Sequence, residues 1–129
     1  MKKLALLLVA AFIVTLFTVS CSKKKDDNTT SPKTYSELIV GRWKTADGGH
    51  YEVYDANGTG HMWDPADDVQ EDEATQFDWE IDNNQLTQYI HMEVGPSIPQ
   101  ICNILILNET TLKYNNDGWR AEYTLIRVN

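Results

Sequence analysis

Clusters of turn-forming residues recur along this chain, and their spacing limits the folds that it can adopt. Clusters rich in Gly, Asn and Asp lie at residues 47–49, 55–58, 82–84, 108–109 and 115–118, and longer connections lie around residues 64–74 and 93–99. Such residues favour hairpin turns over helical crossovers. The pattern predicts an all-β, eight-stranded antiparallel meander, with strands near residues 40–46, 50–54, 59–63, 75–81, 86–92, 100–107, 110–115 and 118–128.

Alternation of apolar and polar residues indicates which side chains face the core. Phe77, Trp79 and Ile81 share one face of their strand. Residues 101–107 are apolar on both faces apart from Asn103, so the linker, a helix or a partner is expected to cover the second face. Eight strands that close into a barrel leave no lateral edge, and the interior is either filled by side chains or holds one small ligand. One short helical turn, capped by Ser36, is expected before the barrel.

The first twenty residues have the layout of a secretory signal peptide. Lys2 and Lys3 precede an apolar run over residues 4–17, which is short for a membrane span. The polar stretch after it buries too little apolar surface to fold. We therefore expect a signal peptide at residues 1–20, a lipidated cysteine and flexible tether at 21–34, and a barrel at 35–129.

The end of the apolar run, Thr18-Val19-Ser20-Cys21, resembles the lipobox of bacterial lipoproteins. The resemblance implies acyl chains on Cys21 that hold the protein on a membrane. The alternative is a secreted protein with an incidental cysteine. Lys25-Asp26-Asp27 also resembles a charged signal that directs lipoproteins to the cell surface. We expect an outer-membrane lipoprotein, with surface-exposed and periplasm-facing positions both left open.

Size, charge and missing motifs exclude several classes of function. The chain has 129 residues, enough for one small domain. Without residues 1–20 it keeps nine basic and nineteen acidic residues, a net charge of −10, which repels nucleic acid. Cys102 lies in an apolar strand and is interpreted as a core residue. No hydrolase, nucleotide-binding or redox motif is present, so we expect neither catalysis nor a cofactor.

The segment Gly41-Arg42-Trp43 resembles the Gly-x-Trp signature of lipocalins, and Arg127 matches the arginine that packs across that tryptophan. The resemblance covers residues 36–128 and implies a lipocalin-like barrel that closes at Gly41, Trp43 and Arg127. Physical chemistry supports this pairing, because a guanidinium stacked on an indole gains about 0.5 to 2 kcal/mol.

Two functions are compatible with such a barrel. In the first, the barrel binds a small, mostly apolar ligand, and Arg42, Tyr51 or His61 orients its polar end. In the second, aromatic side chains fill the barrel and the domain is a non-enzymatic interaction module with an unknown protein partner. The candidate ligand-facing residues are Tyr51, Trp63, Phe77, Trp79, Trp119 and Tyr123.

Two sets of residues are candidates for metal ligands. The acidic stretch over residues 64–73 suits calcium through Asp64, Asp67, Asp68 and Glu71, but it lacks the ligand spacing and central glycine of an EF-hand. A solvated loop is the favoured interpretation. The second set is formed by three histidines on separate predicted strands, without a paired zinc motif. The histidines are His50, His61 and His91.

Overall fold

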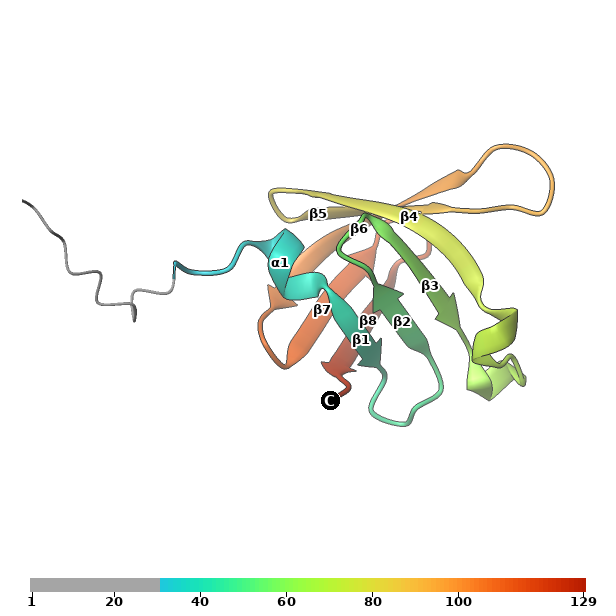
Figure 1. The fold of residues 1–129 in the computed structure, drawn as a ribbon, viewed down its shortest axis with the longest axis horizontal. Coiled ribbons are helices and arrows are strands. Elements are labelled where there is room, and N and C mark those ends of the chain that lie inside the picture. The colour runs from blue at the N-terminus through green and yellow to red at the C-terminus, as the bar shows by residue number, and fades with distance from the viewer. Residues whose placement is uncertain (1–30) are drawn as a thin grey trace, which may run out of the picture. The chain divides into compact units, whose positions relative to one another are not determined.

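Eight antiparallel strands form a closed barrel in the computed structural model, which describes residues 31–129 (Figure 1). Each strand pairs with its neighbours in sequence, and β1 pairs with β8, which confirms the predicted meander. The lipobox, Cys21 and the expected signal peptide lie outside the described residues. The strands are β1 (Gly41–Lys44), β2 (Tyr51–Tyr54), β3 (Thr59–Trp63), β4 (Thr75–Asp82), β5 (Gln85–Ile90), β6 (Ile98–Leu107), β7 (Thr111–Asn116) and β8 (Ala121–Arg127).

One short helix, α1 (Tyr35–Ile39), precedes the barrel and lies against β4 and β6. Its cap is Thr34, so the expectation of Ser36 at this position was wrong. Thr34 accepts a hydrogen bond from the backbone N–H of Glu37, and the Glu37 carboxylate accepts one from the backbone N–H of Thr34. This reciprocal pair satisfies two N–H groups and places the helix cap two residues earlier than expected.

The barrel closes where Trp43 of β1 faces Arg127 of β8 in register. The Arg127 guanidinium carbon lies 4.2 Å from the centroid of the Trp43 ring. Arg127 also donates hydrogen bonds to the backbone carbonyls of Leu38, Val40 and Glu109. One side chain therefore links the last strand, the segment after α1 and the β6–β7 turn.

Gly41 makes this arrangement sterically accessible. Its φ of +135° is a conformation that L side chains rarely adopt, and a Cβ at this position would collide with Nη1 of Arg127. The glycine therefore allows the arginine to cross the start of β1.

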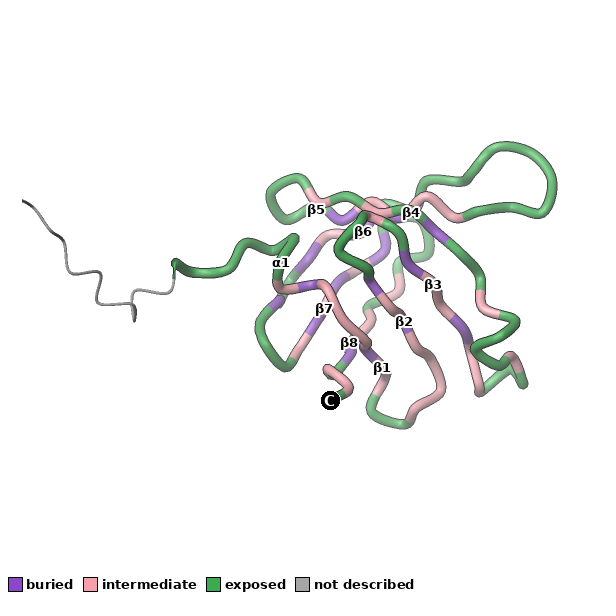
Figure 2. The backbone as a smooth tube through the Cα atoms, in the orientation of Figure 1, coloured by how far each residue is buried: buried purple, intermediate pink, exposed green. Residues whose placement is uncertain are grey.

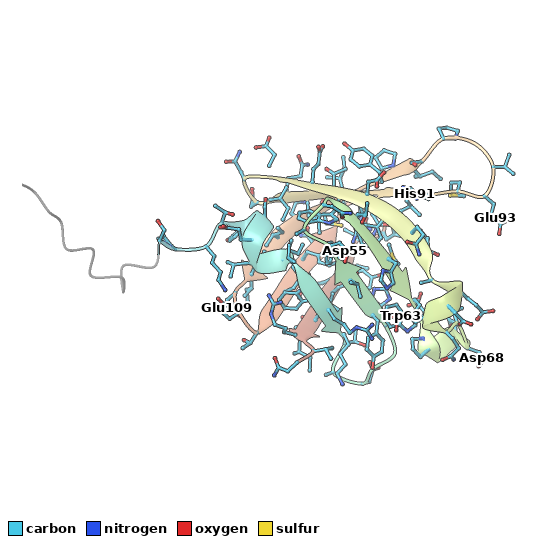
Figure 3. The ribbon with its side chains drawn as sticks, viewed as in Figure 1. Asp55, Trp63, Asp68, His91, Glu93 and Glu109 are labelled. Carbon is cyan, nitrogen blue, oxygen red and sulfur yellow. The ribbon has the colours of Figure 1, made fainter. Side chains whose placement is uncertain are left out.

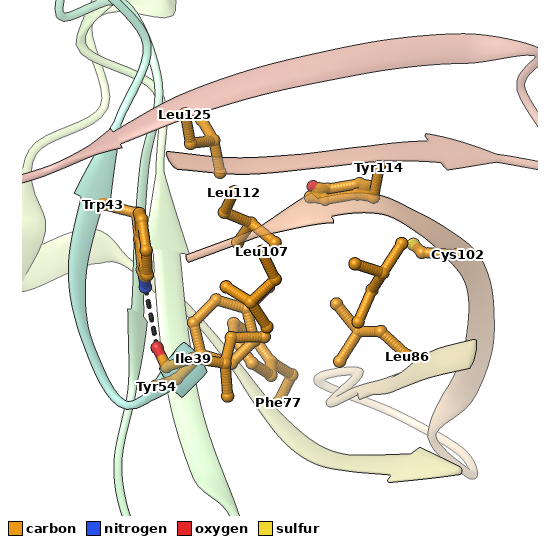
Figure 4. Packing of buried hydrophobic residues seen from close by; sticks show 11 residues of the cluster. Ile39, Trp43, Tyr54, Phe77, Leu86, Cys102, Leu107, Leu112, Tyr114 and Leu125 are labelled. Atoms are coloured by element: carbon orange, nitrogen blue, oxygen red, sulfur yellow. Dashed lines mark hydrogen bonds between the residues drawn. The ribbon is translucent and has the colours of Figure 1, made fainter. Parts of the chain in front are cut away.

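Large buried side chains pack together inside the barrel (Figure 4), and buried residues recur along its strands (Figure 2). Trp43 is fully buried, and its indole N–H donates to the backbone carbonyl of Ile39 at 2.7 Å. Tyr54 packs edge-on against Phe77, with 5.4 Å between ring centroids. Leu86, Leu112 and Leu125 extend the same core.

A β-bulge explains the consecutive apolar residues at the end of β6. Cys102 and Ile104 point inward, but the register with β7 shifts between Ile104 and Ile106. A bulge inserts one unpaired residue and so resets the alternation. Leu105 and Ile106 are both exposed as a result, at 46% and 43%, whereas Leu107 is buried. No described element covers this outer face.

The meander separates the connections into two groups, one at each end of the barrel. The closed end carries α1 and the three short turns, and Glu109 lies there. The open end carries the β1–β2, β3–β4, β5–β6 and β7–β8 connections, where Asp68 and Glu93 lie (Figure 3). The β3–β4 connection contains two 3-10 turns, Pro65–Asp67 and Glu71–Glu73.

Replacing Trp43 with Ala should lower the free energy of unfolding by about 3 to 5 kcal/mol, because it removes a fully buried indole from the closure. Urea unfolding followed by circular dichroism measures this loss. Trp119→Ala is the matched control: Trp119 is 78% exposed, so its loss should stay within about 0.5 kcal/mol. Equal effects of the two substitutions would contradict the closure described above.

Candidate functional site

A buried carboxylate lies inside the barrel, towards its open end. Glu52 on β2 is 1% exposed. Its Oε1 accepts hydrogen bonds from the Tyr114 hydroxyl and from His50 Nε2, the latter at 2.9 Å. Its Oε2 accepts one from the Tyr54 hydroxyl at 2.6 Å. A buried carboxylate is costly unless it is paired and hydrogen-bonded, and both oxygens of Glu52 meet that condition.

The two phenols act as neutral donors to this carboxylate. Burial, followed by the nearby charge of Glu52, raises the pKa of Tyr54 and of Tyr114 well above the usual value. The Tyr54 hydroxyl in turn accepts from Gln88 Nε2 at 2.7 Å. Gln88 Oε1 is buried and has no hydrogen-bond partner among the described residues. The interior network therefore ends in an unused acceptor.

His50 connects the interior carboxylate to the β3–β4 connection. Its Nδ1 lies 2.6 Å from Oδ1 of Asp64, and its Nε2 faces Glu52. Burial disfavours the charged ring, but the hydrogen bonds and negative charges of Glu52 and Asp64 outweigh burial and raise the pKa of His50 to about 9. The imidazolium donates from both nitrogens at neutral pH, and so bridges the two carboxylates.

Above this bridge is a hollow that we call the open-end pocket. Its volume is about 210 Å³, and His50, Met62, Asp64 and Tyr123 line it. Three further lining residues, Gln100, Asn116 and Trp119, also line a second hollow beside it. The open-end pocket therefore combines polar groups from His50 and Asp64 with the aromatic rings of Tyr123 and Trp119, and it is continuous with the second hollow.

The second hollow, which we call the side groove, has a volume of about 410 Å³ and is mainly apolar. Ile90, Ile98, Pro99 and Ile101 line it along β5 and β6, and Trp119 lines it from the β7–β8 turn. Ile98 and Trp119 are 53% and 78% exposed. Such a surface can bury the apolar body of a small molecule.

The structure divides the six candidate ligand-facing aromatics into three groups. Phe77, Trp79 and Tyr123 point into the barrel, and Trp119 lies at the rim of the open end. Tyr51 and Trp63 lie on the outer face of the sheet, because their strand neighbours Glu52 and Met62 form the inward-facing pair. Trp63 is nevertheless only 5% exposed.

The outward-facing pair forms a separate stack, with 4.8 Å between the ring centroids of Tyr51 and Trp63. Arg42 covers Trp63 at 5.2 Å from the ring centroid, and His61 stacks on the same indole. The expected orienting residues Arg42, Tyr51 and His61 therefore belong to the outer surface and do not line the pocket.

The acidic stretch is distributed among separate contacts. Asp64 binds His50, whereas Glu71 binds Arg42 and His61. Asp67 and Asp68 are exposed in or next to the first 3-10 turn. Within residues 31–129, no group of three or more His, Cys, Asp or Glu side chains is placed to hold a metal ion. Each histidine pairs with different carboxylates: His91 with Asp78, His61 with Glu71, and His50 with Glu52 and Asp64. The three histidines therefore do not converge on one site.

Cys102 is buried on β6 and faces the interior. Burial, with a smaller effect from Glu52, raises the pKa of its thiol to about 12. A thiol in that state is a poor nucleophile at neutral pH, as expected of a core residue.

Sequence reasoning missed Glu52, Gln88 and Tyr114. In Tyr51-Glu52-Val53-Tyr54 both alternation phases contain an aromatic residue, so the pattern leaves the inward face undecided. The pairing of β1 with β2 resolves the ambiguity: Glu52 lies directly opposite Trp43, so the two side chains share the inward face.

No protein-family model, curated protein or solved structure matches the chain. Among residues 31–129, no helix is long and apolar enough to cross a membrane. The geometry at the open end is therefore the basis for inferring a function.

His50 should make stability fall at alkaline pH. Its pKa is raised from 6.5 to about 9, so its contribution is fully present below pH 6.5 and is lost as the pH rises through 9. Between pH 6.5 and 9.5, the urea midpoint of the wild-type chain should fall further than that of His50→Gln. His91→Gln, which removes a more exposed histidine paired with one carboxylate, should keep the wild-type profile. Parallel profiles for wild type and His50→Gln would contradict the bridge.

Proposed function

We propose that this chain is a lipocalin-like lipoprotein of the bacterial cell envelope that binds a small, mostly apolar ligand at the open end of its barrel. The observation that carries the proposal is the side groove, an apolar hollow that opens directly beside a pocket with a polar floor. Ligand sites commonly combine an apolar lining with a few polar groups that orient the ligand.

Binding would proceed by burial of apolar ligand surface. Each Å² removed from water contributes about 25 cal/mol. The apolar body would lie against Ile98, Ile101 and Trp119, and the polar end would face Asp64 and Gln100. The proposal requires no catalytic residue and no cofactor.

The geometry of the closed end supports the lipocalin-like assignment. Gly41, Trp43 and Arg127 are close together, with the arginine over the indole and the glycine beneath the arginine. Such an arrangement matches the family resemblance in the sequence, and it keeps one end of the barrel shut so that a ligand has access from the other.

The proposed anchor is Cys21, with the domain held at the outer membrane by acyl chains. Support comes from the lipobox-like sequence. Lys33 forms an ion pair with Glu109 at the closed end, which is the end where the described chain begins. A domain tethered there can present its open end to solvent.

The second candidate function is a non-enzymatic protein-interaction module. Two observations favour it: large side chains occupy much of the barrel interior, and the outer face of β6 exposes Leu105 and Ile106. The two functions differ in which apolar surface is essential.

Native mass spectrometry of the full chain in a neutral detergent, after incubation with lipid and metabolite extract of its source organism, should show a stoichiometric adduct. Ile98→Glu places a charge in the side groove and should abolish the adduct. Ile126→Glu should retain it, because Ile126 is another exposed strand isoleucine, at 40%, that does not line the groove. An adduct that is insensitive to Ile98→Glu would contradict this binding site.

The anchor is tested with the two cysteines of the chain. Cells fed an alkyne-labelled fatty acid should label the wild type and Cys102→Ala, whereas Cys21→Ala should lose both the label and its place in the membrane pellet. Labelled Cys21→Ala would overturn the lipoprotein assignment.

A further inference from the structure

The residues around the open-end pocket carry an excess of negative charge. Glu52 and Asp64 lie on either side of a single imidazolium, that of His50, which leaves one negative charge uncompensated. Asp117 lines the adjoining side groove. No lysine or arginine is among the residues that line either hollow, and Arg120 lines a neighbouring hollow that shares Asn116 and Asp117 with the side groove and also contains Glu122. The nearest fixed charges therefore attract a cation.

Hydrogen-bonding capacity points the same way. Oδ1 of Asp64 accepts from His50, whereas its Oδ2 has no partner among the described residues. The Asp64 side chain is 46% exposed, so this oxygen can be reached from solvent. Deeper in the barrel, Gln88 Oε1 is a fully buried acceptor without a described donor. Gln88 lines neither hollow, so the spare acceptor of the pocket itself is Asp64 Oδ2, and the His50 donors are both engaged.

The apolar part of the lining also suits a cation. Tyr123 and Trp119 present aromatic rings, and Met62 presents a thioether. Aromatic faces attract ammonium groups, more strongly when the groups are partly desolvated. The pKa of Tyr123 is raised, first by burial and then by Glu52 and Asp64, as expected where the potential is negative.

We propose that the open-end pocket selects ligands that carry a protonated amine on an apolar body, with the ammonium group on Asp64 and the aromatic rings and the body in the side groove. This inference rests on the proposed small-ligand function and specifies its ligand class. An anionic lipid-like ligand would meet repulsion from the same carboxylates.

Three probes of matched size test the inference: 2-phenylethylamine, 2-phenylethanol and 3-phenylpropanoate. Each is titrated at pH 7 into the full chain in a neutral detergent, followed by the indole ¹H–¹⁵N signals of its four tryptophans. The Trp119 signal reports the open end, and the Trp43 signal reports the closed end. The amine should bind about tenfold more tightly than the alcohol, the carboxylate should bind most weakly, and only Trp119 among these two should shift.

Asp64→Asn should bring the amine to within about twofold of the alcohol, because it removes the charge and keeps the shape. Asp67→Asn is the control: it makes the same change in net charge three residues away on an exposed side chain that lines neither hollow. An unchanged Trp43 signal verifies that each variant is folded, and the wild-type preference is itself a test that needs no variant.

Each other outcome overturns the inference in a distinguishable way. Equal binding of amine and alcohol, with the Trp119 signal shifting, removes the cation preference and leaves the small-ligand function intact. Tighter binding of 3-phenylpropanoate than of the amine would show that the electrostatic potential in the pocket is positive and not negative. If no probe shifts the Trp119 signal, the amine class is excluded. The small-ligand function is then decided separately by native mass spectrometry, that is, by whether the wild-type chain shows an adduct that Ile98→Glu loses.

Discussion

The buried carboxyl group of Glu52 is the constraint on which the interior of this barrel depends. A carboxylate removed from water costs several kcal/mol unless other groups compensate it. Two of the compensating groups are local, the Tyr54 hydroxyl on the same strand and His50 two residues before Glu52, whereas the Tyr114 hydroxyl comes from β7, 62 residues further along the chain. Their convergence fixes the relative positions of these elements. It also fills the middle of the barrel with a polar network, which leaves the open end as the place where a ligand has room.

The two ends of the barrel have different physical roles. At the closed end, Arg127 combines stacking on Trp43 with hydrogen bonds to three backbone carbonyls, so the first and last strands are joined by a side chain as well as by the sheet. At the open end, His50 links the interior to Asp64 on a connecting segment. The closed end therefore supplies stability, and the open end supplies a charged floor next to exposed apolar surface. Each end depends on a different cationic side chain, Arg127 at the closed end and His50 at the open end, and the partners of each lie on more than one element.

Much of the fold follows from local signals, and much of the site does not. Turn clusters and alternation predict the eight strands, and Phe77 and Trp79 face inward as their alternation indicates. Glu52 was missed, because its strand has an aromatic residue in each phase and glutamate usually points to solvent. Tyr51 was expected inside the barrel as a bulky aromatic residue, and Trp63 at its rim because it precedes the acidic stretch, but the two rings stack on the outer face of the sheet. The bulge of β6 and the pairing of Glu52 with Tyr114 depend on contacts between strands, which no local pattern in one sequence contains.

A crystal structure of the chain with bound 2-phenylethylammonium tests most directly whether the polar network places the ligand at the open end. We expect the nitrogen within hydrogen-bonding distance of Asp64, the phenyl ring against Ile98 and Trp119, and the Glu52 contacts to Tyr54 and Tyr114 intact. A ring bound in the barrel interior between Phe77 and Trp79, with the Tyr54–Glu52 hydrogen bond broken, would contradict it.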